Sequence, residues 1–330
     1  MKFSLRLTSP TNLFALPLFA CAWCLLPITL HATAPPSGDG EQTFASPDQA
    51  IAALKTAVAT NDRAALARLF GPQFHELMTG DPVQDTNNTK RFAAEMAQSC
   101  HTVQDTDDQI SIEVGPNDWP MPIPLRKSGG QWYFDTAAGK EEIINRHIGK
   151  DELHAIGTCR AYVIAQQRYA DANPTGASET TYAQHLKSNP GKKDGLYWPV
   201  APNEPASPFG SLVADAQAEG YVLHPNATGP HPFHGYYFRI LTRQGPAAPG
   251  GKLDYLDHGN LTGGFALVAW PEHWDQSGVM TFIVARDGKV YQRNFAEQTS
   301  QLAATLKEYN PDSDWTLVED PGVSDPVSRK

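Results

Sequence analysis

Residues 264–270 have the sequence Gly-Phe-Ala-Leu-Val-Ala-Trp, and residues 280–284 follow with Met-Thr-Phe-Ile-Val. A third run, Tyr-Tyr-Phe-Arg-Ile-Leu, precedes them at residues 236–241. Short apolar or alternating runs that are rich in aromatic and β-branched residues are typical of buried or half-buried strands. Asp287-Gly288 is a pair that two-residue hairpin turns favour, and it leads into Val290-Tyr291. The last third of the chain is therefore predicted to form an antiparallel meander.

Helices are predicted before and after these strands in the sequence. Residues 141–170 carry apolar side chains at helical spacing, with an interruption expected at Gly149-Lys150. Residues 298–309 can close the chain as a second helix. Residues 173–208 are rich in Pro, Gly and Asn, and irregular stretches of this length often have a functional or packing role. The C-terminal half is thus expected to pack a long helix on an antiparallel sheet.

The N-terminal half is predicted to begin with helices and to continue with strands. Ser46-Pro47-Asp48-Gln49 has the N-cap, first-turn proline and distal glutamine of a capping box. Asn61 or Asp62 is expected to cap a second short helix, and residues 92–96 favour a third. Residues 110–114 alternate as a strand does, and residues 123–134 have the pattern of a hairpin. Helices followed by antiparallel strands indicate the α+β class.

The first 34 residues have the features of an export signal. Lys2 and Arg6 precede an apolar stretch, and Ala32-Thr33-Ala34 matches the small-residue cleavage pattern. A lipoprotein signal at Cys21 is the alternative. We therefore expect a signal peptide at 1–34, a flexible linker at 35–42, and a periplasmic or secreted location with no membrane span after cleavage. Two domains follow in this prediction, an N-terminal domain at 43–137 and a C-terminal domain at 138–330.

The composition indicates a globular protein and makes nucleic-acid binding unfavourable. The chain has 330 residues, of which 41% are apolar, so it can bury a substantial core. Its 36 acidic residues outnumber 26 basic ones and give a formal net charge of −10. Nucleic-acid-binding domains carry basic patches, so nucleic acid is an unfavourable partner.

Cys100 and Cys159 are the two cysteines that remain after removal of the predicted signal. In an oxidising compartment two cysteines favour a disulfide bond, so we predict a Cys100–Cys159 bridge. Two separate buried thiols are the alternative.

Long stretches of the chain resemble one family of secreted bacterial proteins. They include Trp119–Leu125, Trp132–Thr136, Asp194–Pro199 and His234–Phe238. On these stretches residues 44–320 are identified as a member of domain-of-unknown-function family 2950. That resemblance implies export and an α+β fold, and it supplies no catalytic residues because the family has no established activity.

Two architectural resemblances are weaker. The helices and strands of residues 43–137 are similar to the cone-shaped domains of the nuclear-transport-factor-2-like superfamily, which often enclose a pocket. The helix ending at Ala170, Gly235-Tyr236 and Ala269-Trp270-Pro271 resemble the heads of type IV pilins and pseudopilins. This second likeness implies a pilin-like C-terminal domain.

Weak metal-site patterns occur at two places. His231 and His234 could provide zinc ligands together with acids further along the chain. Asp312 and Asp314 alternate as calcium ligands do, although the same residues favour turns. We therefore expect no cofactor, with zinc or calcium as the alternatives.

Acid–base candidates are also present. Glu141, Glu142, His147 and His154 lie on the long predicted helix, while His75, Glu76 and His101 lie in the N-terminal domain. A histidine paired with a carboxylate can do general acid–base work. No complete catalytic motif accompanies these residues, so the sequence does not decide whether the protein is an enzyme.

Aromatic residues in proline-rich loops are the candidate interaction surface. Tyr197, Trp198 and Trp274 are amphipathic side chains of the kind that interfaces favour. The sequence therefore predicts a non-enzymatic adaptor that binds a protein partner of the cell envelope. The alternative is a periplasmic small-ligand binder or hydrolase that uses a pocket in the N-terminal domain.

Overall fold

The computed structural model describes residues 40–222 and 231–319, which belong to one compact unit, Ser37–Lys330. The predicted signal peptide at 1–34 lies outside the described residues, as does most of the predicted linker. The described residues form helices and antiparallel sheets, so the α+β class is confirmed. Two hydrophobic clusters fill the unit, one from residues 44–134 and one from residues 155–315. The predicted boundary between residues 137 and 138 stays a prediction.

The N-terminal half places helices against a sheet. The helices are α1 (Pro47–Ala59), α2 (Arg63–Phe70), the 3-10 helix η1 (Gly71–Leu77) and α3 (Pro82–Gln98). The strands are β1 (Cys100–Thr106), β2 (Gln109–Val114), β3 (Trp119–Pro120), β4 (Leu125–Ser128) and β5 (Gln131–Phe134). They pair antiparallel in the order β1-β2-β4-β5, and β3 pairs with β2. The apolar residues of β2 and β5 face the helices because those strands contact α1, α2 and α3.

Capping residues explain where these helices begin. The Ser46 hydroxyl accepts a hydrogen bond from the Gln49 amide, and the Gln49 side chain accepts one from the Ala45 amide. The predicted capping box is thus formed with one difference, because the Gln49 side chain bonds the amide one residue before the N-cap. The Asp62 carboxylate caps α2, and the Asp81 carboxylate caps α3 through the amides of residues 83 and 84. Each cap satisfies amide groups that have no partner within the helix.

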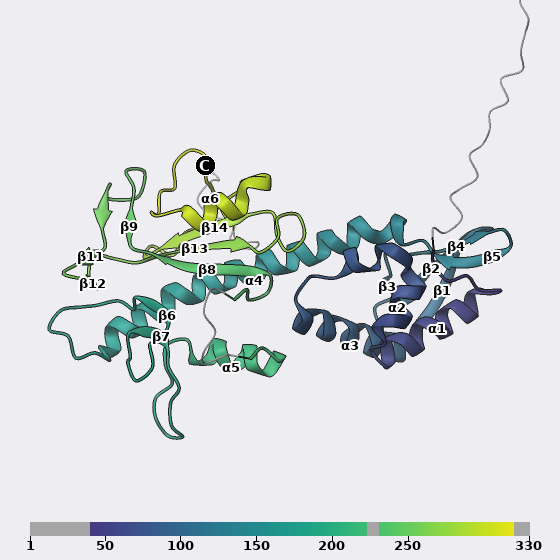
Figure 1. The fold of residues 1–330 in the computed structure, drawn as a ribbon, viewed down its shortest axis with the longest axis horizontal. Coiled ribbons are helices and arrows are strands. Elements are labelled where there is room, and N and C mark those ends of the chain that lie inside the picture. The colour runs from purple at the N-terminus through teal and green to yellow at the C-terminus, as the bar shows by residue number, and fades with distance from the viewer. Residues whose placement is uncertain (1–39, 223–230, 320–330) are drawn as a thin grey trace, which may run out of the picture. The chain divides into compact units, whose positions relative to one another are not determined.

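Helix α4 (Thr136–Ala172) is continuous over 37 residues and belongs to both halves of the unit. It contacts η1 near its start and strands of the C-terminal sheet further on, and Figure 1 shows it as the long teal helix. The predicted interruption at Gly149-Lys150 is wrong. A glycine within a helix costs about 1 kcal/mol relative to alanine, and the burial of the apolar side chains of Ile148 and Ala155 around it outweighs that cost.

The C-terminal half is built on one five-stranded antiparallel sheet. Its order is β16-β15-β14-β13-β8. The strands are β8 (Tyr236–Leu241), β13 (Ala266–Pro271), β14 (Thr281–Ala285), β15 (Val290–Arg293) and β16 (Thr316–Leu317). Helix α4 contacts β13, β14 and β15, while α6 (Thr299–Thr305) contacts β13. Figure 1 shows α4 and α6 on opposite sides of this sheet. Every residue of β13 and β14 is buried as a result.

Shorter elements complete the fold. They are β6 (His185–Lys187), β7 (Gly195–Tyr197), α5 (Gly210–Glu219), β9 (Arg243–Gln244), β10 (Leu253–Asp254), β11 (Leu256–Asp257), β12 (Asn260–Leu261) and η2 (Ala296–Gln298). The closing helix predicted at 298–309 ends early, at Thr305. The Arg239 guanidinium donates to the carbonyls of Ala303 and Leu306 at 3.0 and 2.6 Å, so these groups are satisfied without a further helical turn.

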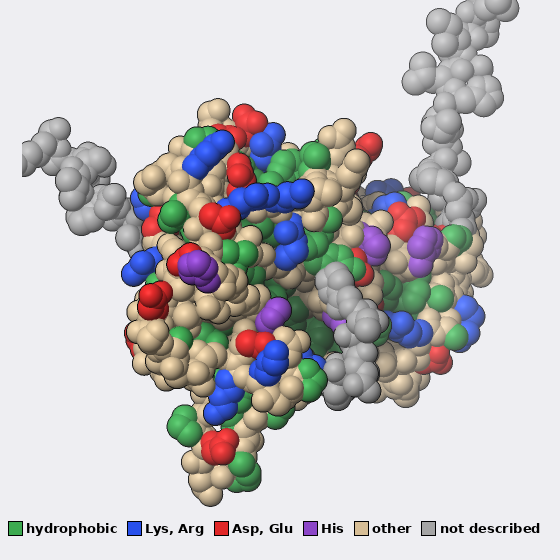
Figure 2. All heavy atoms as spheres, turned by 60° about the vertical axis from the view of Figure 1, so that its left-hand side comes forward, with side chains coloured by type: hydrophobic (Ala, Val, Ile, Leu, Met, Phe, Trp, Pro, Cys, Tyr) green, Lys and Arg blue, Asp and Glu red, His purple; other side chains and the backbone are tan. Residues whose placement is uncertain are grey.

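No helix in the described ranges combines the length and apolar character that crossing a membrane requires. Charged side chains of both signs are interspersed over the face shown in Figure 2, with no broad basic patch.

Candidate functional site

A cavity of about 660 Å³ lies in the N-terminal half. Residues of α2, η1, α3, the β2–β3 region and α4 line it. Its apolar wall consists mainly of Leu66, Phe70, Phe74, Leu77, Phe92, Met121 and Ile123. Pockets for small molecules usually measure roughly 300–1,000 Å³ and combine apolar walls with a few polar groups. In size and lining this cavity matches such a pocket.

Charged side chains also line the cavity, and all of them come from α3 and α4. The acidic ones are Asp85 and Glu95, both on α3. The basic ones are Arg91 on α3, with Arg146, His147 and Lys150 on α4. Whether this charge is available to a ligand depends on how each group is already paired.

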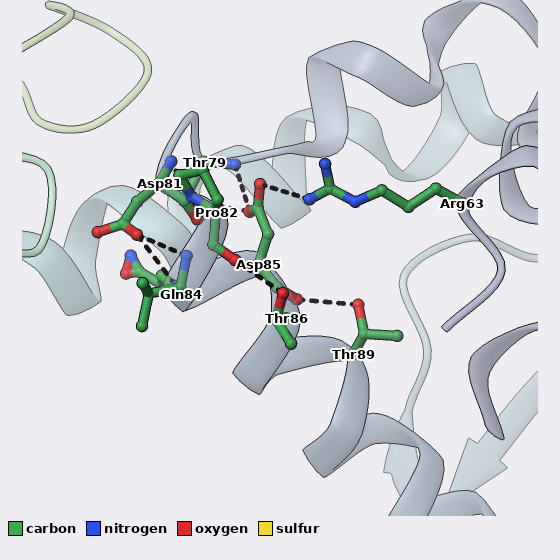
Figure 3. A network of polar contacts seen from close by, with 9 residues as sticks. Arg63, Thr79, Asp81, Pro82, Gln84, Asp85, Thr86 and Thr89 are labelled. Carbon is green, nitrogen blue, oxygen red and sulfur yellow. Dashed lines mark hydrogen bonds and ion pairs between the residues drawn. The ribbon is translucent and has the colours of Figure 1, made fainter. Parts of the chain in front are cut away.

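Asp85 is held by contacts with Thr79 and Arg63, which Figure 3 shows. Its carboxylate accepts hydrogen bonds from the Thr79 amide at 2.9 Å and from the Thr79 hydroxyl at 2.8 Å. The Arg63 guanidinium lies 3.4 Å from the other carboxylate oxygen. Asp85 is buried, and these donors compensate its charge. The cations of α4 are therefore not needed to neutralise it.

Arg146 is also paired within the chain. Its Nε donates to the Glu142 carboxylate at 2.6 Å. Its guanidinium lies 4.7 Å from the centre of the Trp119 ring, a distance at which a cation is attracted to an aromatic face. Trp119 in turn packs edge-on against Phe92. Arg146 therefore holds the aromatic side of the cavity together.

Arg91 and Lys150, here named the cationic cluster, and the neighbouring His147 are not paired with any acid among the described residues. Arg91 donates to the neutral amide oxygen of Asn88 at 2.9 Å. Within the described ranges, the His147 imidazole and the Lys150 ammonium form no hydrogen bond or ion pair. Burial is the main cause that lowers the pKa of both groups, and the charge of Arg91 lowers each pKa further. The cluster thus concentrates positive charge beside an apolar cavity.

A family model described as Protein of unknown function (DUF2950) matches residues 41–318. The chain belongs to this family. The match includes every residue that lines the cavity. No curated protein and no solved structure matches the chain. The likeness of the C-terminal half of this DUF2950 protein to pilin heads therefore stays a prediction.

The predicted acid–base residues of the DUF2950 protein do not converge on one site. His147 lines the cavity, whereas His154 packs its ring 3.9 Å from that of His234. His75 contacts the carbonyl of Pro72 at 2.7 Å, and Glu76 pairs with Lys140 at 2.7 Å. Only His147 is therefore placed where it could meet a ligand of this cavity.

Three of the four predicted metal ligands, Asp312, Asp314 and His234, have a partner among the described residues. Asp314 pairs with Arg293 at 2.9 Å, and Asp312 accepts the Asp314 amide within a turn. His231 is exposed, while His234 is buried with its Nε2 3.0 Å from a Glu219 carboxylate oxygen. Burial lowers the pKa of His234 to about 3, so its imidazole is neutral.

In the described part of the chain, one group brings three potential metal ligands within 4.8 Å of one another: His101, Glu113 and Asp118. His101 and Glu113 face each other across β1 and β2. His101 Nε2 lies 2.8 Å from an Asp118 oxygen and 3.5 Å from a Glu113 oxygen. The same ring nitrogen therefore contacts both carboxylates directly.

The predicted aromatic surface is only half exposed. Trp198 packs edge-on against Tyr169, and the Lys193 ammonium lies 5.6 Å from its ring centre. Tyr197 and Trp198 both pack against the C-terminal core. Trp274 is half-buried, and its indole N–H donates to Asn294 at 3.1 Å. All three side chains thus have partners within the chain.

The predicted Cys100–Cys159 bridge is not formed in this structure, because both residues are free thiols. Cys100 packs against the N-terminal cluster, whereas Cys159 is fully buried in the C-terminal cluster. The two cysteines therefore belong to different cores, and the alternative of two separate thiols holds.

The sequence interpretation missed Arg91 and Lys150. One pattern could have indicated Lys150, because Arg146 and Lys150 are like charges at positions i and i+4 of a helix. Such a pair destabilises a helix by about 0.2–0.5 kcal/mol. An uncompensated cation of this kind is a reason to look for an anionic ligand.

Proposed function

We propose that this DUF2950 protein is exported and binds a small molecule in the cavity of its N-terminal half. The apolar wall formed by residues of α2, η1, α3 and the segment after β3 supports this proposal. The lining contains one histidine, no serine and no cysteine among the described residues, and Asp85 is already saturated with donors. Ligand binding is therefore a better match to the cavity than covalent catalysis.

The export part of the proposal rests on residues 1–34. Their basic start, apolar stretch and Ala32-Thr33-Ala34 ending have the order of a secretory signal. Expression in a Gram-negative host, cell fractionation and intact-mass measurement test it. A product that starts near Pro35 in the periplasm or medium is expected, and an uncleaved cytoplasmic product would contradict it.

The adaptor alternative rests on Tyr197, Trp198 and Trp274. Because these side chains pack within the chain, they offer less free apolar surface than the sequence suggested. The cavity therefore supports the binding function more than the adaptor function.

A matched pair of threonines tests binding in the cavity. The Thr86 and Thr89 hydroxyls each donate to a carbonyl four residues earlier on α3, at 2.8 and 2.9 Å, and both are drawn in Figure 3. Only Thr89 lines the cavity. Thr89→Phe places a ring in the cavity, whereas Thr86→Phe changes the same helix outside it.

The environment-sensitive dye 8-anilinonaphthalene-1-sulfonate is a suitable first probe. We expect saturable one-to-one binding to the wild-type protein and to Thr86→Phe, and loss of about tenfold or more in affinity for Thr89→Phe. Circular dichroism establishes that both variants are folded. Equal dye binding by all three proteins would contradict a function for the cavity.

A further inference from the structure

We propose that the ligand is an amphipathic anion whose apolar part lies against the apolar wall of the cavity and whose head group binds Arg91 and Lys150. This inference rests on the proposed function and adds the chemical class of the ligand. It depends on whether each charged group that lines the cavity is already paired within the chain.

The acids of the cavity do not neutralise the cationic cluster. Asp85 is bound by Thr79 and Arg63. The Glu95 carboxylate is directed at Gly115, at the end of β2, where it fills the space that a Cβ atom would occupy. No ion pair joins Glu95 to Arg91 or Lys150 in the described residues. The positive charge of the cluster is therefore available to an anion.

The cations of the cluster repel one another in the absence of a ligand. The charge of Arg91 lowers the pKa of Lys150, and Arg91 and Lys150 both lower the pKa of His147. Asp85 raises the pKa of His147. Asp151 and Glu219 likewise raise the pKa of Lys150. Arg91 lies on α3 and Lys150 on α4, so two helices hold the like charges beside one cavity. A bound anion would remove this repulsion, which favours its binding.

His147 can add a neutral hydrogen-bond donor to this site. Burial lowers the pKa of its imidazole, which favours the neutral form of the ring. One ring nitrogen then carries hydrogen, and no partner within the described residues accepts it. A carboxylate, sulfonate or phosphate oxygen would satisfy this donor together with the two cations.

The positive charge of the cluster contrasts with the negative net charge of the whole chain. With a formal net charge of −10, the protein as a whole repels anions. The cationic cluster is thus a local exception beside a mainly apolar wall. A neutral apolar ligand would gain nothing from it, whereas a highly charged ligand without an apolar part would leave the wall of Phe70, Phe74 and Leu77 unfilled.

Two ligands of equal length separate the contribution of the head group to binding from the contribution of the apolar part. Dodecanoate and dodecanol share one alkyl length and differ in charge. Each is titrated below its aggregation limit against the dye-loaded wild-type protein. We expect dodecanoate to displace the dye at a concentration at least about tenfold lower than dodecanol, because two charge-assisted contacts form with the carboxylate.

Neighbouring basic residues provide the matched variants. Arg91→Gln and Lys150→Gln remove one charge each from the cluster. Lys90→Gln removes an exposed charge from α3, the helix that carries Arg91, and Lys90 does not line the cavity. We expect the preference for dodecanoate over dodecanol to fall about tenfold in the first two variants and to remain unchanged in Lys90→Gln.

The outcomes separate this inference from the proposed function. Equal displacement by dodecanoate and dodecanol, with Thr89→Phe weakening both, overturns the anionic class and leaves the binding cavity in place. No displacement by either ligand, with no effect of Thr89→Phe on dye binding, overturns both. A preference for dodecanoate that Lys90→Gln lowers as much as Arg91→Gln does would overturn the assignment to the cluster.

Discussion

The side-chain amide of Gln84 donates a hydrogen bond of 2.6 Å to the carboxylate of Asp151, which joins the start of α3 to the middle of α4. Both side chains are buried, and Asp151 is fully inaccessible to solvent. The second Asp151 oxygen has no hydrogen-bond partner among the described residues and lies near Gly235, at the start of β8. Asp151 is therefore a buried carboxylate at a junction between three elements. Burial raises its pKa to about 7.

This raised pKa predicts that Asp151 lowers stability as the pH increases. The pKa of a free aspartate is about 3.9, so between that value and about 7 the folded state binds more protons than the unfolded state. The free energy of unfolding should then fall across this range. Asp151→Asn keeps an acceptor for Gln84 and removes the titration. Its stability relative to wild type should rise from pH 4 to pH 7, by up to about 4 kcal/mol, and stay constant above pH 8.

Chemical denaturation of both proteins at pH 4, 5, 6, 7 and 8 measures this difference directly. Comparing the two proteins cancels the contributions of other titrating groups. Asp171→Asn, an exposed substitution near the end of α4, serves as the control and should give a constant difference. Parallel stability curves for wild type and Asp151→Asn would refute the prediction.

Two glycines of α4 should respond in opposite directions to alanine. Gly149 is exposed, and a Cβ atom at this position would meet nothing within 4 Å. Gly149→Ala should therefore stabilise the protein by about 0.5–1 kcal/mol, the usual gain in helix propensity. A Cβ atom at Gly139 would lie 2.5 Å from the carbonyl oxygen of Pro122, so Gly139→Ala should destabilise it by more than this amount. Thermal unfolding of both variants tests the continuity of the helix, and a loss of stability in Gly149→Ala would contradict it.

The strands were predictable because their side chains obey simple patterns. β2 alternates between buried and half-buried positions, and β13 is buried at every position, as its continuous apolar run indicates. The interruption predicted at Gly149 failed for an energetic reason. The propensity cost of one glycine is small beside the burial of its neighbours, and the sequence pattern does not show that burial.

A pocket in the N-terminal domain was expected only from an architectural resemblance, and its lining could not be predicted, because no short pattern contains it. Its lining comes from segments between residues 58 and 150 that only the folded chain brings together. Arg91 and Lys150 lie on different helices, so no spacing rule relates them. The predicted disulfide failed for a similar reason, since the sequence does not show that Cys100 and Cys159 belong to different hydrophobic clusters.

The two thiols should be free and unequal in reactivity. Burial raises the pKa of Cys159 to about 12 and raises the pKa of Cys100 less strongly. Thiolates are the reactive form, so Cys100 should react slowly in the native protein and Cys159 only after unfolding. Mass spectrometry of the native and unfolded protein after iodoacetamide treatment measures both. A mass two units lower without reductant than with it would indicate a disulfide and contradict this assignment.

Replacing Trp198 should lower stability, because its ring is packed within the chain. It contacts Tyr169 edge-on and lies beside the Lys193 ammonium, so Trp198→Ala removes both contacts and part of the C-terminal core. We expect a loss of about 1–3 kcal/mol, below the full cost of a completely buried tryptophan. Val200→Ala, at an exposed apolar position in the same loop, should change stability by less than about 0.5 kcal/mol. Urea denaturation of the three proteins measures the difference. If Trp198→Ala is as stable as wild type, the ring does not support the core, and its role as a free interaction surface becomes the better explanation.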